Sequence, residues 1–193
     1  PRIVVSKCLE FSACRWNGLK ISNPIIQQLM EFVEFIPVCP EVEIGLGVPR
    51  DPSRIIEQDN QMEMVDSTTG ENFTEKMKAF AEDFLSKLPQ VEGFILKTRS
   101  PSCGIYNVKV YPRAGKAMVL HTKGVGLFAE KVKENYSLMA LEDDGRILNL
   151  KIREHFFTKI YTIFRFNNLE KKMGNLVEFH ARNKYLFMAY NQA

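Results

Sequence analysis

Three short apolar runs lie in the first half of the chain, and a cysteine motif follows each of them. The runs cover residues 3–5, 35–38 and 94–96. Apolar runs of this length, bounded by polar residues, are typical of buried β-strands. Two weaker runs, residues 54–57 and 62–65, also predict short strands.

Helical periodicity follows in other segments. Asn23 and Pro24 begin the first helix, because Asn is a favoured N-cap residue and Pro is favoured at the first helical position. Apolar residues at helical spacing then form one face of this helix, which extends as far as Val33. Further helices are predicted over residues 73–87 and 127–134, and strands over 117–120 and 137–141. Such alternation predicts an α/β fold with a mostly parallel, Rossmann-like sheet and flanking helices.

The pattern changes after a polar turn at residues 142–145. Residues 152–166 and 169–190 are predicted to be helical throughout. We therefore expect an α/β domain over residues 1–147 and part of an all-α domain over residues 148–193. Two helices cannot cover this much apolar surface alone, so we expect the chain to be a fragment or its helical part to need a partner.

Composition restricts the class of protein. An apolar content of 45% and a charged content of 25% are ordinary for a globular protein. No apolar stretch has the roughly 20 residues of a membrane span, and no signal peptide is visible. Four irregularly spaced cysteines then predict reduced thiols in the cytoplasm. The net charge of +3 permits a nucleic-acid partner but does not require one.

Three of the cysteines follow the three apolar runs. Cys8, Cys39 and Cys103 would lie beyond the carboxyl ends of their strands, where an open α/β sheet collects its ligands. Three thiolates suit a soft metal or an iron–sulfur cluster and leave one position open for chemistry. The alternative is that the three cysteines are small core residues. Cys14 is conceivable as a fourth ligand, and the absence of a Cys-x-x-Cys pair disfavours structural zinc.

Several motifs match a known family. They are Ser6-x-Cys8-Leu9, Cys14-Arg-Trp-Asn-Gly18, Pro37-Val-Cys39-Pro-Glu41 and Ser100-Pro-Ser-Cys103-Gly104. Over roughly residues 1–145 the chain resembles the DUF523 family, whose characterised members are thiouracil desulfidases. The segment from about residue 150 resembles the start of the helical DUF1722 domain, on a pattern that includes His180. The fusion of the two resembles the tRNA 4-thiouridine desulfidases.

The resemblance implies a [4Fe-4S] cluster held by Cys8, Cys39 and Cys103, with one open iron. It implies an enzyme that replaces the sulfur of a 4-thiouracil ring with oxygen and releases sulfide. The substrate would be thiolated tRNA or the free thiouracil base. Glu41, close to Cys39, would transfer protons, and Ser100 would hydrogen bond to substrate or water.

Other residues of the motifs are expected to bind substrate: Ser6, Asn17, Lys97 and Ser102. Asn17 stands where the family has Asp, so one carboxylate is missing. Each catalytic assignment has a structural alternative. Glu41 could cap the following segment or pair with Arg50, and Ser100 could cap the turn at Pro101. The alternative function is a non-catalytic iron–sulfur or zinc protein that acts as a redox sensor or binding module.

Two further features lie outside these motifs. Gly124-Val-Gly126 imitates the start of a dinucleotide fingerprint, with Asp144 about 20 residues further on, but its late position favours a plain tight turn. The helical segment is also basic, which indicates a solvated face or a surface that follows tRNA phosphates. Its basic residues are Arg153, Lys159, Arg165, Lys171, Lys172, Arg182 and Lys184.

Overall fold

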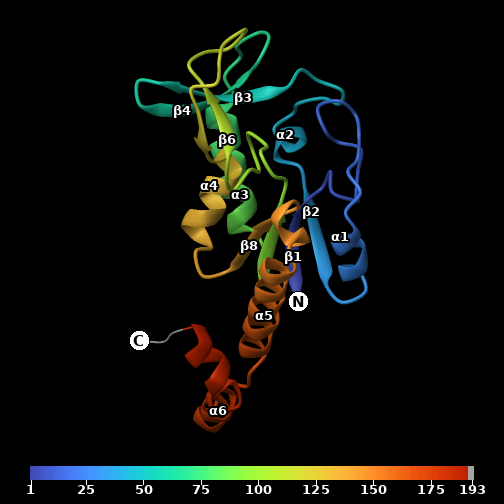
Figure 1. Ribbon diagram of the computed structural model, residues 1–193, viewed down its shortest axis with the longest axis vertical. Helices are drawn as coiled ribbons and strands as arrows, with labels where there is room; N and C mark the ends of the chain where they lie inside the picture. Colours follow the sequence, from blue (N-terminus) through green and yellow to red (C-terminus); the bar gives the residue numbers. More distant parts are fainter. Residues whose placement is uncertain (191–193) are drawn as a thin grey trace.

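A parallel sheet forms the centre of the molecule. The computed structural model describes residues 1–190. The sheet order is β2 (Glu34–Val38), β1 (Arg2–Ser6), β5 (Gly93–Leu96) and β8 (Ala140–Asp143), and every neighbouring pair is parallel (Figure 1). All four carboxyl ends therefore lie at one edge of this sheet, as the sequence predicted for three of them.

Helices cover both faces of the central sheet. Alternate side chains of β1 enter two different cores: Val4 packs with residues of α3 (Thr74–Ser86) and α4 (Leu127–Asn135). Ile3 and Val5 pack on the opposite face with residues of α1 (Pro24–Leu29) and of a later helix, α5. Because both faces are buried, the strands consist of nearly continuous apolar runs. The prediction of an α/β fold with flanking helices is confirmed.

A second sheet lies at the end of the molecule away from α5 (Figure 1). Its order is β4 (Gln61–Asp66), β3 (Ser53–Gln58), β6 (Val108–Tyr111) and β7 (His121–Gly124). β3 and β4 are antiparallel and joined by a turn whose residues Asp59 and Asn60 have φ values of 51° and 61°. Asn and Asp tolerate this left-handed conformation better than most residues. Both sheets contribute side chains to one buried cluster, so they share a hydrophobic core.

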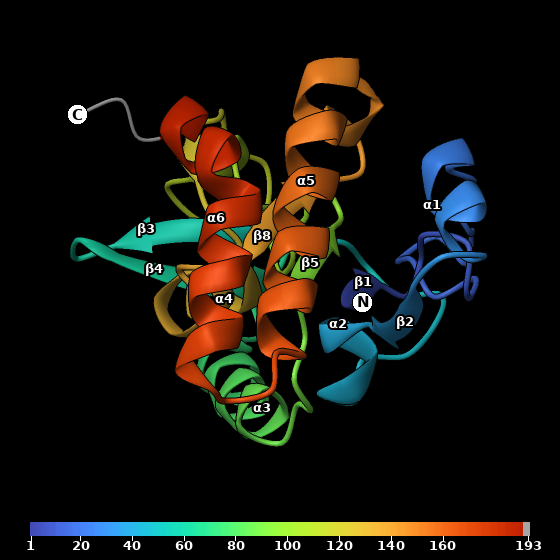
Figure 2. The ribbon, with the colours of Figure 1, turned by 90° about the horizontal axis from the view of Figure 1, so that it is seen from below.

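The last two helices, α5 (Leu150–Asn167) and α6 (Met173–Tyr190), lie side by side (Figure 2). Phe156 and Ile160 of α5 are buried in the cluster that contains Ile3 and Ile95, so α5 also packs on the central sheet. In α6 the buried residue is Asn183. The division of the chain near residue 147 remains a prediction. Within the described part, no helix is both long and apolar enough to span a bilayer.

Several elements differ from the sequence pattern. The predicted strand over residues 117–120 is wrong, because Met118 is 89% exposed and the run has no core to pack against. The strand predicted over residues 137–141 lies later, as β8, since Leu138 is 78% exposed. The first helix ends at Leu29, before Val33. Short elements were missed: the strands β6 and β7, the helix α2 (Pro40–Glu43) and a 3₁₀ turn (Arg146–Leu148).

Candidate active site

A cavity of about 450 Å³ lies at the carboxyl edge of the central sheet. All four cysteines line it: Cys8, Cys14, Cys39 and Cys103. Cys8 comes two residues after β1, Cys39 directly after β2, and Cys103 in the loop after β5. The expected meeting of Cys8, Cys39 and Cys103 at one sheet edge is therefore observed. The structure adds Cys14, whose carbonyl oxygen lies 3.8 Å from the Cys39 sulfur.

Backbone hydrogen bonds position Cys8 and Cys39. Cys39 is the N-cap of α2, and its carbonyl oxygen accepts hydrogen bonds from the amides of Val42 and Glu43. Pro40 at the first position of α2 favours this helix start. The carbonyl oxygen of Cys8 accepts a hydrogen bond from the Ile21 amide at 2.8 Å. Both cysteines therefore have defined backbones although they lie outside the strands.

The Cys103 loop is fixed on the N-terminus of α4. The carbonyl oxygen of Pro101 accepts a hydrogen bond from the Leu127 amide, and that of Ser102 accepts one from the Ala129 amide, both at 3.1 Å. The Gly126 amide donates to the carbonyl oxygen of Gly104. These bonds occupy the helix amides that a phosphate would need. Gly124 ends β7 and Gly126 is the N-cap of α4, so the glycine pattern joins a strand directly to the helix that seats the cysteine loop. The tight turn predicted there is not formed.

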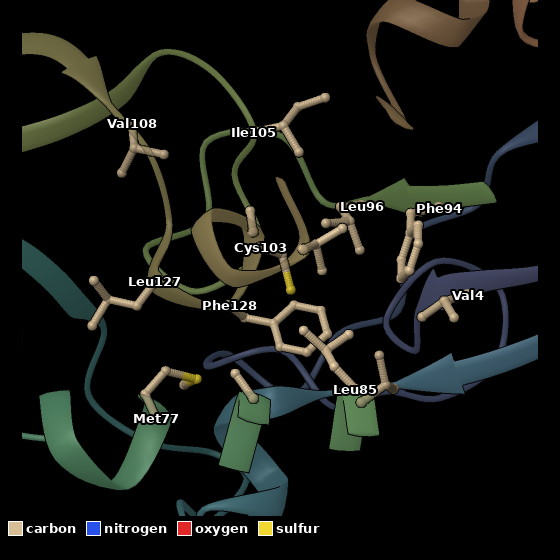
Figure 3. Packing of buried hydrophobic residues seen from close by; sticks show 14 of the residues in the cluster. Val4, Met77, Leu85, Phe94, Leu96, Cys103, Ile105, Val108, Leu127 and Phe128 are labelled. Atoms are coloured by element: carbon tan, nitrogen blue, oxygen red, sulfur yellow. The ribbon is translucent and has the colours of Figure 1, made fainter. Parts of the chain in front are cut away.

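Cys103 is itself part of the hydrophobic core. Its side chain lies among Leu96, Ile105 and Phe128 (Figure 3). Burial, the main cause, raises the pKa of the Cys103 thiol to about 12. The pKa of Cys39 lies far above its ordinary value, first because of its hydrogen bond with Cys14 and then because of burial. Without a cation, these thiols therefore keep their protons at neutral pH.

The raised pKa of Cys103 predicts alkaline instability of the cluster-free protein. The pKa rises from the ordinary value of 9.0 to about 12 on folding, so the native state holds a proton that the unfolded state has lost. Stability is therefore complete below pH 9.0 and falls between pH 9.0 and about 12, by up to about 1.4 kcal/mol per pH unit. Urea unfolding with reduced thiols at several pH values would show a shallower decline in Cys103→Ser. Equal slopes in the two proteins would contradict this assignment.

Glu41 is buried in the cavity wall and has two partners. Its Oε2 accepts hydrogen bonds from Arg50, at 2.6 Å from Nη2 and 3.1 Å from Nε. Its Oε1 accepts a hydrogen bond from the Ser102 hydroxyl at 2.8 Å. Arg50 also donates to the carbonyl oxygens of Cys14 and Gly47. The pairing of Glu41 with Arg50, one of the two alternatives, is thus observed, and it orients the carboxylate in the cavity.

Ser100 continues this network. Its hydroxyl oxygen lies 2.9 Å from the Ser102 hydroxyl and accepts a hydrogen bond from the Cys103 amide at 3.2 Å. Both serines line the cavity, with Ser102 only 1% exposed. The structure therefore links Arg50, Glu41, Ser102 and Ser100 in one chain of hydrogen bonds that ends beside Cys103.

The remaining predicted substrate-binding residues have different positions. Ser6 lines the cavity but accepts a hydrogen bond from the Lys97 amide at 2.9 Å, which joins the ends of β1 and β5. The Lys97 ammonium pairs with Asp144 at 2.8 Å, and Asp144 also accepts from the Thr98 amide. Asn17 does not line the cavity, and its side chain accepts from the Leu19 amide. Trp16, beside it, does line the cavity.

The donor set and the charge of the cavity fit a thiolate-bound iron–sulfur cluster. In the described part of the chain, no three His, Cys, Asp or Glu side chains are placed to hold a single metal ion. The cysteines instead border the cavity from three strand ends, which suits a larger group with several irons. Lys7, Arg15 and Arg99 line the cavity without an ion pair to a described residue. Their positive charge would compensate an anionic cluster.

Fold and site together define an α/β protein with a thiol-lined cavity at the carboxyl edge of a parallel sheet. A family model described as 2-thiouracil desulfurase matches residues 3–144, and the chain belongs to this family. The resemblance to DUF523 is thereby confirmed, whereas the resemblance of the helical segment to DUF1722 stays a prediction.

Two similar proteins are informative. YbbK, an uncharacterized protein of Bacillus subtilis (strain 168), is 33% identical over 115 residues, which span 54% of this chain and 76% of that protein. The solved structure of the [4Fe-4S]-dependent thiouracil desulfidase TudS superposes with a TM-score of 0.57 at 22% identity. It covers 80% of this chain and 97% of its own. At this identity the likeness establishes a shared fold.

Sequence reasoning missed two residues that support the site. Arg50 was considered only as a structural partner of Glu41, and Asp144 only as part of the dinucleotide pattern. Asp144 is 8% exposed, and its contacts with Lys97 and Thr98 fix the start of the cysteine loop. Its position after a predicted strand was the one available signal, because polar residues there lie at the ligand-binding edge.

Proposed function

We propose that this protein is a [4Fe-4S]-dependent desulfidase that replaces the sulfur of a 4-thiouracil ring with oxygen. The single observation that supports it best is the convergence of Cys8, Cys39 and Cys103 on one cavity beside the carboxylate of Glu41. Thiolates would hold the cluster, and a carboxylate at the same cavity can move protons. The family membership supports the same reaction class.

In this proposal, the cysteines bind the cluster and Glu41 transfers protons. When bound, the cluster would supply an open iron that attracts the soft thiocarbonyl sulfur and makes the ring carbon more electrophilic. Cys8, Cys39 and Cys103 would hold it as thiolates. Cys14 lies within hydrogen-bond reach of Cys8 and Cys39, and its single thiol proton is directed toward the Cys8 sulfur.

Glu41 is positioned to handle the protons of the reaction. Water contributes its oxygen to the ring carbon, and its two protons leave with the displaced sulfur as hydrogen sulfide. Glu41 would accept the first proton from water and return it to the leaving sulfur. Arg50 keeps Oε2 in place, and the Ser100 and Ser102 hydroxyls would orient the water or the ring oxygen.

The nature of the substrate beyond the ring is a second part of the proposal. We propose thiolated tRNA or the free base, with α5 and α6 as the RNA-binding part in the tRNA case. Lys171 and Lys184 are exposed there without an ion pair to a described residue. Lys172 and Arg182 are paired with Glu170 and Glu178, so part of the basic surface is neutralised within the helices.

Anaerobic reconstitution of the full chain with iron and sulfide is the direct test. The reconstituted protein is expected to bleach the thiocarbonyl absorbance of 4-thiouracil or 4-thiouridine and to release an equal amount of sulfide. The variant Cys39→Ser should bind less iron and show no turnover. Iron uptake without turnover of the base, the nucleoside or thiolated tRNA would favour a redox-sensing or binding module. Equal iron content in the variant would contradict the assigned ligands.

A further inference from the structure

A cavity of about 300 Å³ lies where α4, the start of β8 and α5 meet. None of the described residues that line it also lines the thiol cavity, so it is a separate site. Aromatic side chains form much of its wall: Tyr106, Tyr136, His155 and Phe156. We call it the junction cavity, because it brings α5 together with elements of the α/β part of the chain.

Two lysines from different helices line the junction cavity. Lys133 of α4 donates a hydrogen bond to the Ile105 carbonyl oxygen at 2.6 Å, and its ammonium lies 4.5 Å from the centre of the Tyr106 ring. Lys159 of α5 donates a hydrogen bond to the Met139 carbonyl oxygen at 3.0 Å. An ammonium group carries three protons, so each lysine keeps further donors after its carbonyl contact. The carbonyl contacts thus fix both ammonium groups at the cavity wall without using up their hydrogen-bonding capacity.

The positive charge of the two lysines has no counter-charge. Within residues 1–190 neither ammonium forms an ion pair. Among the described residues Glu142 is the one carboxylate that lines the cavity, and Arg146 already binds both of its oxygens, at 2.8 and 3.3 Å. Burial lowers the pKa of Lys159, and it lowers that of Lys133 although Glu130 acts in the opposite direction. A cation that has lost water and gained no opposite charge favours a ligand that brings one.

From this geometry we propose that the junction cavity binds a phosphate dianion, either inorganic phosphate or the end group of a small phosphate monoester, which joins α4 to α5. A phosphate monoester carries about −1.5 to −2 charges at pH 7, which two ammonium groups match. Its oxygens accept the lysine protons that the carbonyl contacts leave free. The phosphodiester of a nucleic-acid backbone carries a single charge and would leave one lysine uncompensated. The site is independent of the proposed desulfidase function, because the two cavities share no lining residue.

Titration calorimetry of the full chain with sodium phosphate, at an ionic strength held constant with sodium chloride, measures the affinity. The double variant Lys133→Gln/Lys159→Gln should bind phosphate about tenfold more weakly, a change worth about 1.4 kcal/mol. Lys151→Gln is the matched control, because Lys151 is an exposed lysine of the same helix α5 that does not line the junction cavity. Equal affinities in the double variant and the control, or no binding to the unmodified chain, would overturn the proposal.

Acetylation of the unmodified chain tests the same site without any substitution, so the result does not depend on how the variants fold. N-hydroxysuccinimide acetate labels free amines, and peptide mass spectrometry reports each lysine separately. Phosphate should slow the labelling of Lys133 and Lys159 with the midpoint found by calorimetry and leave Lys151 unchanged. Equal effects on all three lysines would contradict binding in the junction cavity.

Competition experiments identify the form of the ligand. Displacement of inorganic phosphate by glycerol 3-phosphate would assign the cavity to phosphate monoesters, and its failure to compete would assign the cavity to the free ion. Displacement by an RNA oligonucleotide without terminal phosphates, weakened in the double variant, would overturn the dianion in favour of a phosphodiester. Amide hydrogen exchange in α5 should slow when phosphate is added, and unchanged exchange would contradict the joining of α4 to α5.

Discussion

Replacing Glu41 by glutamine is expected to lower kcat by a factor of about 10²–10⁴, the range contributed by general acid–base groups. The variant keeps an acceptor for the Ser102 hydroxyl but loses the ability to take a proton. Since Glu41 holds none of the predicted cluster contacts, iron content should stay near that of the unmodified protein. Turnover of 4-thiouracil or 4-thiouridine, measured beside iron content and thermal stability, separates lost chemistry from lost structure.

Two further variants keep this prediction testable. Glu41→Asp retains the charge for Arg50, so it controls for loss of the buried ion pair, in which both side chains are about 10% exposed. It should fold as the parent does and recover part of the activity. Glu43→Gln removes an exposed carboxylate from the same short helix and should leave kcat unchanged. Retained turnover in Glu41→Gln would rule out proton transfer by this residue.

Gly126→Ala should have a large effect on both stability and the cysteine loop, although it adds only one methyl group. A Cβ atom there would lie 2.5 Å from both the carbon and the oxygen of the Ser102 carbonyl, and 2.9 Å from the Cys103 amide nitrogen. The φ of Gly126 is −74°, which alanine adopts freely, so the conflict is steric. Overpacking of this kind costs about 1–3 kcal/mol. Here the backbone that must move carries Cys103.

The expected result is therefore a loss of both stability and iron. Urea unfolding and iron content after anaerobic reconstitution measure the two effects on the same preparation. Gly174→Ala is the matched control, because nothing lies within 4 Å of the added methyl group and alanine favours a helix. Unchanged iron content in Gly126→Ala would show that the α4 terminus does not position the cysteine loop.

The thiol arrangement could be predicted because it depends on a rule of sheet topology. Apolar runs identify buried strands, parallel strands align their carboxyl ends, and a cysteine that follows each strand must then lie at the same edge. Distances along the chain are irrelevant to this argument, which is why Cys8 and Cys103 could be placed together. The motifs around them identified the family that the comparison confirms.

Segments at the sheet edges, and the side-chain partners of individual residues, could not be predicted in the same way. The run at residues 117–120 is apolar but exposed, and β6 is too short for its alternation to be read from sequence. A hydrophobic pattern predicts burial only where another element packs on the segment, and the tertiary fold determines which element that is. Likewise, nothing local distinguishes an arginine that orients a carboxylate from one on the surface.

By itself, the sequence determined the α/β class, the two-sided burial of the central strands and the meeting of Cys8, Cys39 and Cys103. Each follows from local periodicity and chain topology. Tertiary structure alone decided that Arg50 holds Glu41, that Asp144 holds Lys97, and that α4 seats the cysteine loop. These contacts join elements 9 to 47 residues apart through side-chain direction and hydrogen-bond geometry, which become defined only when the elements pack.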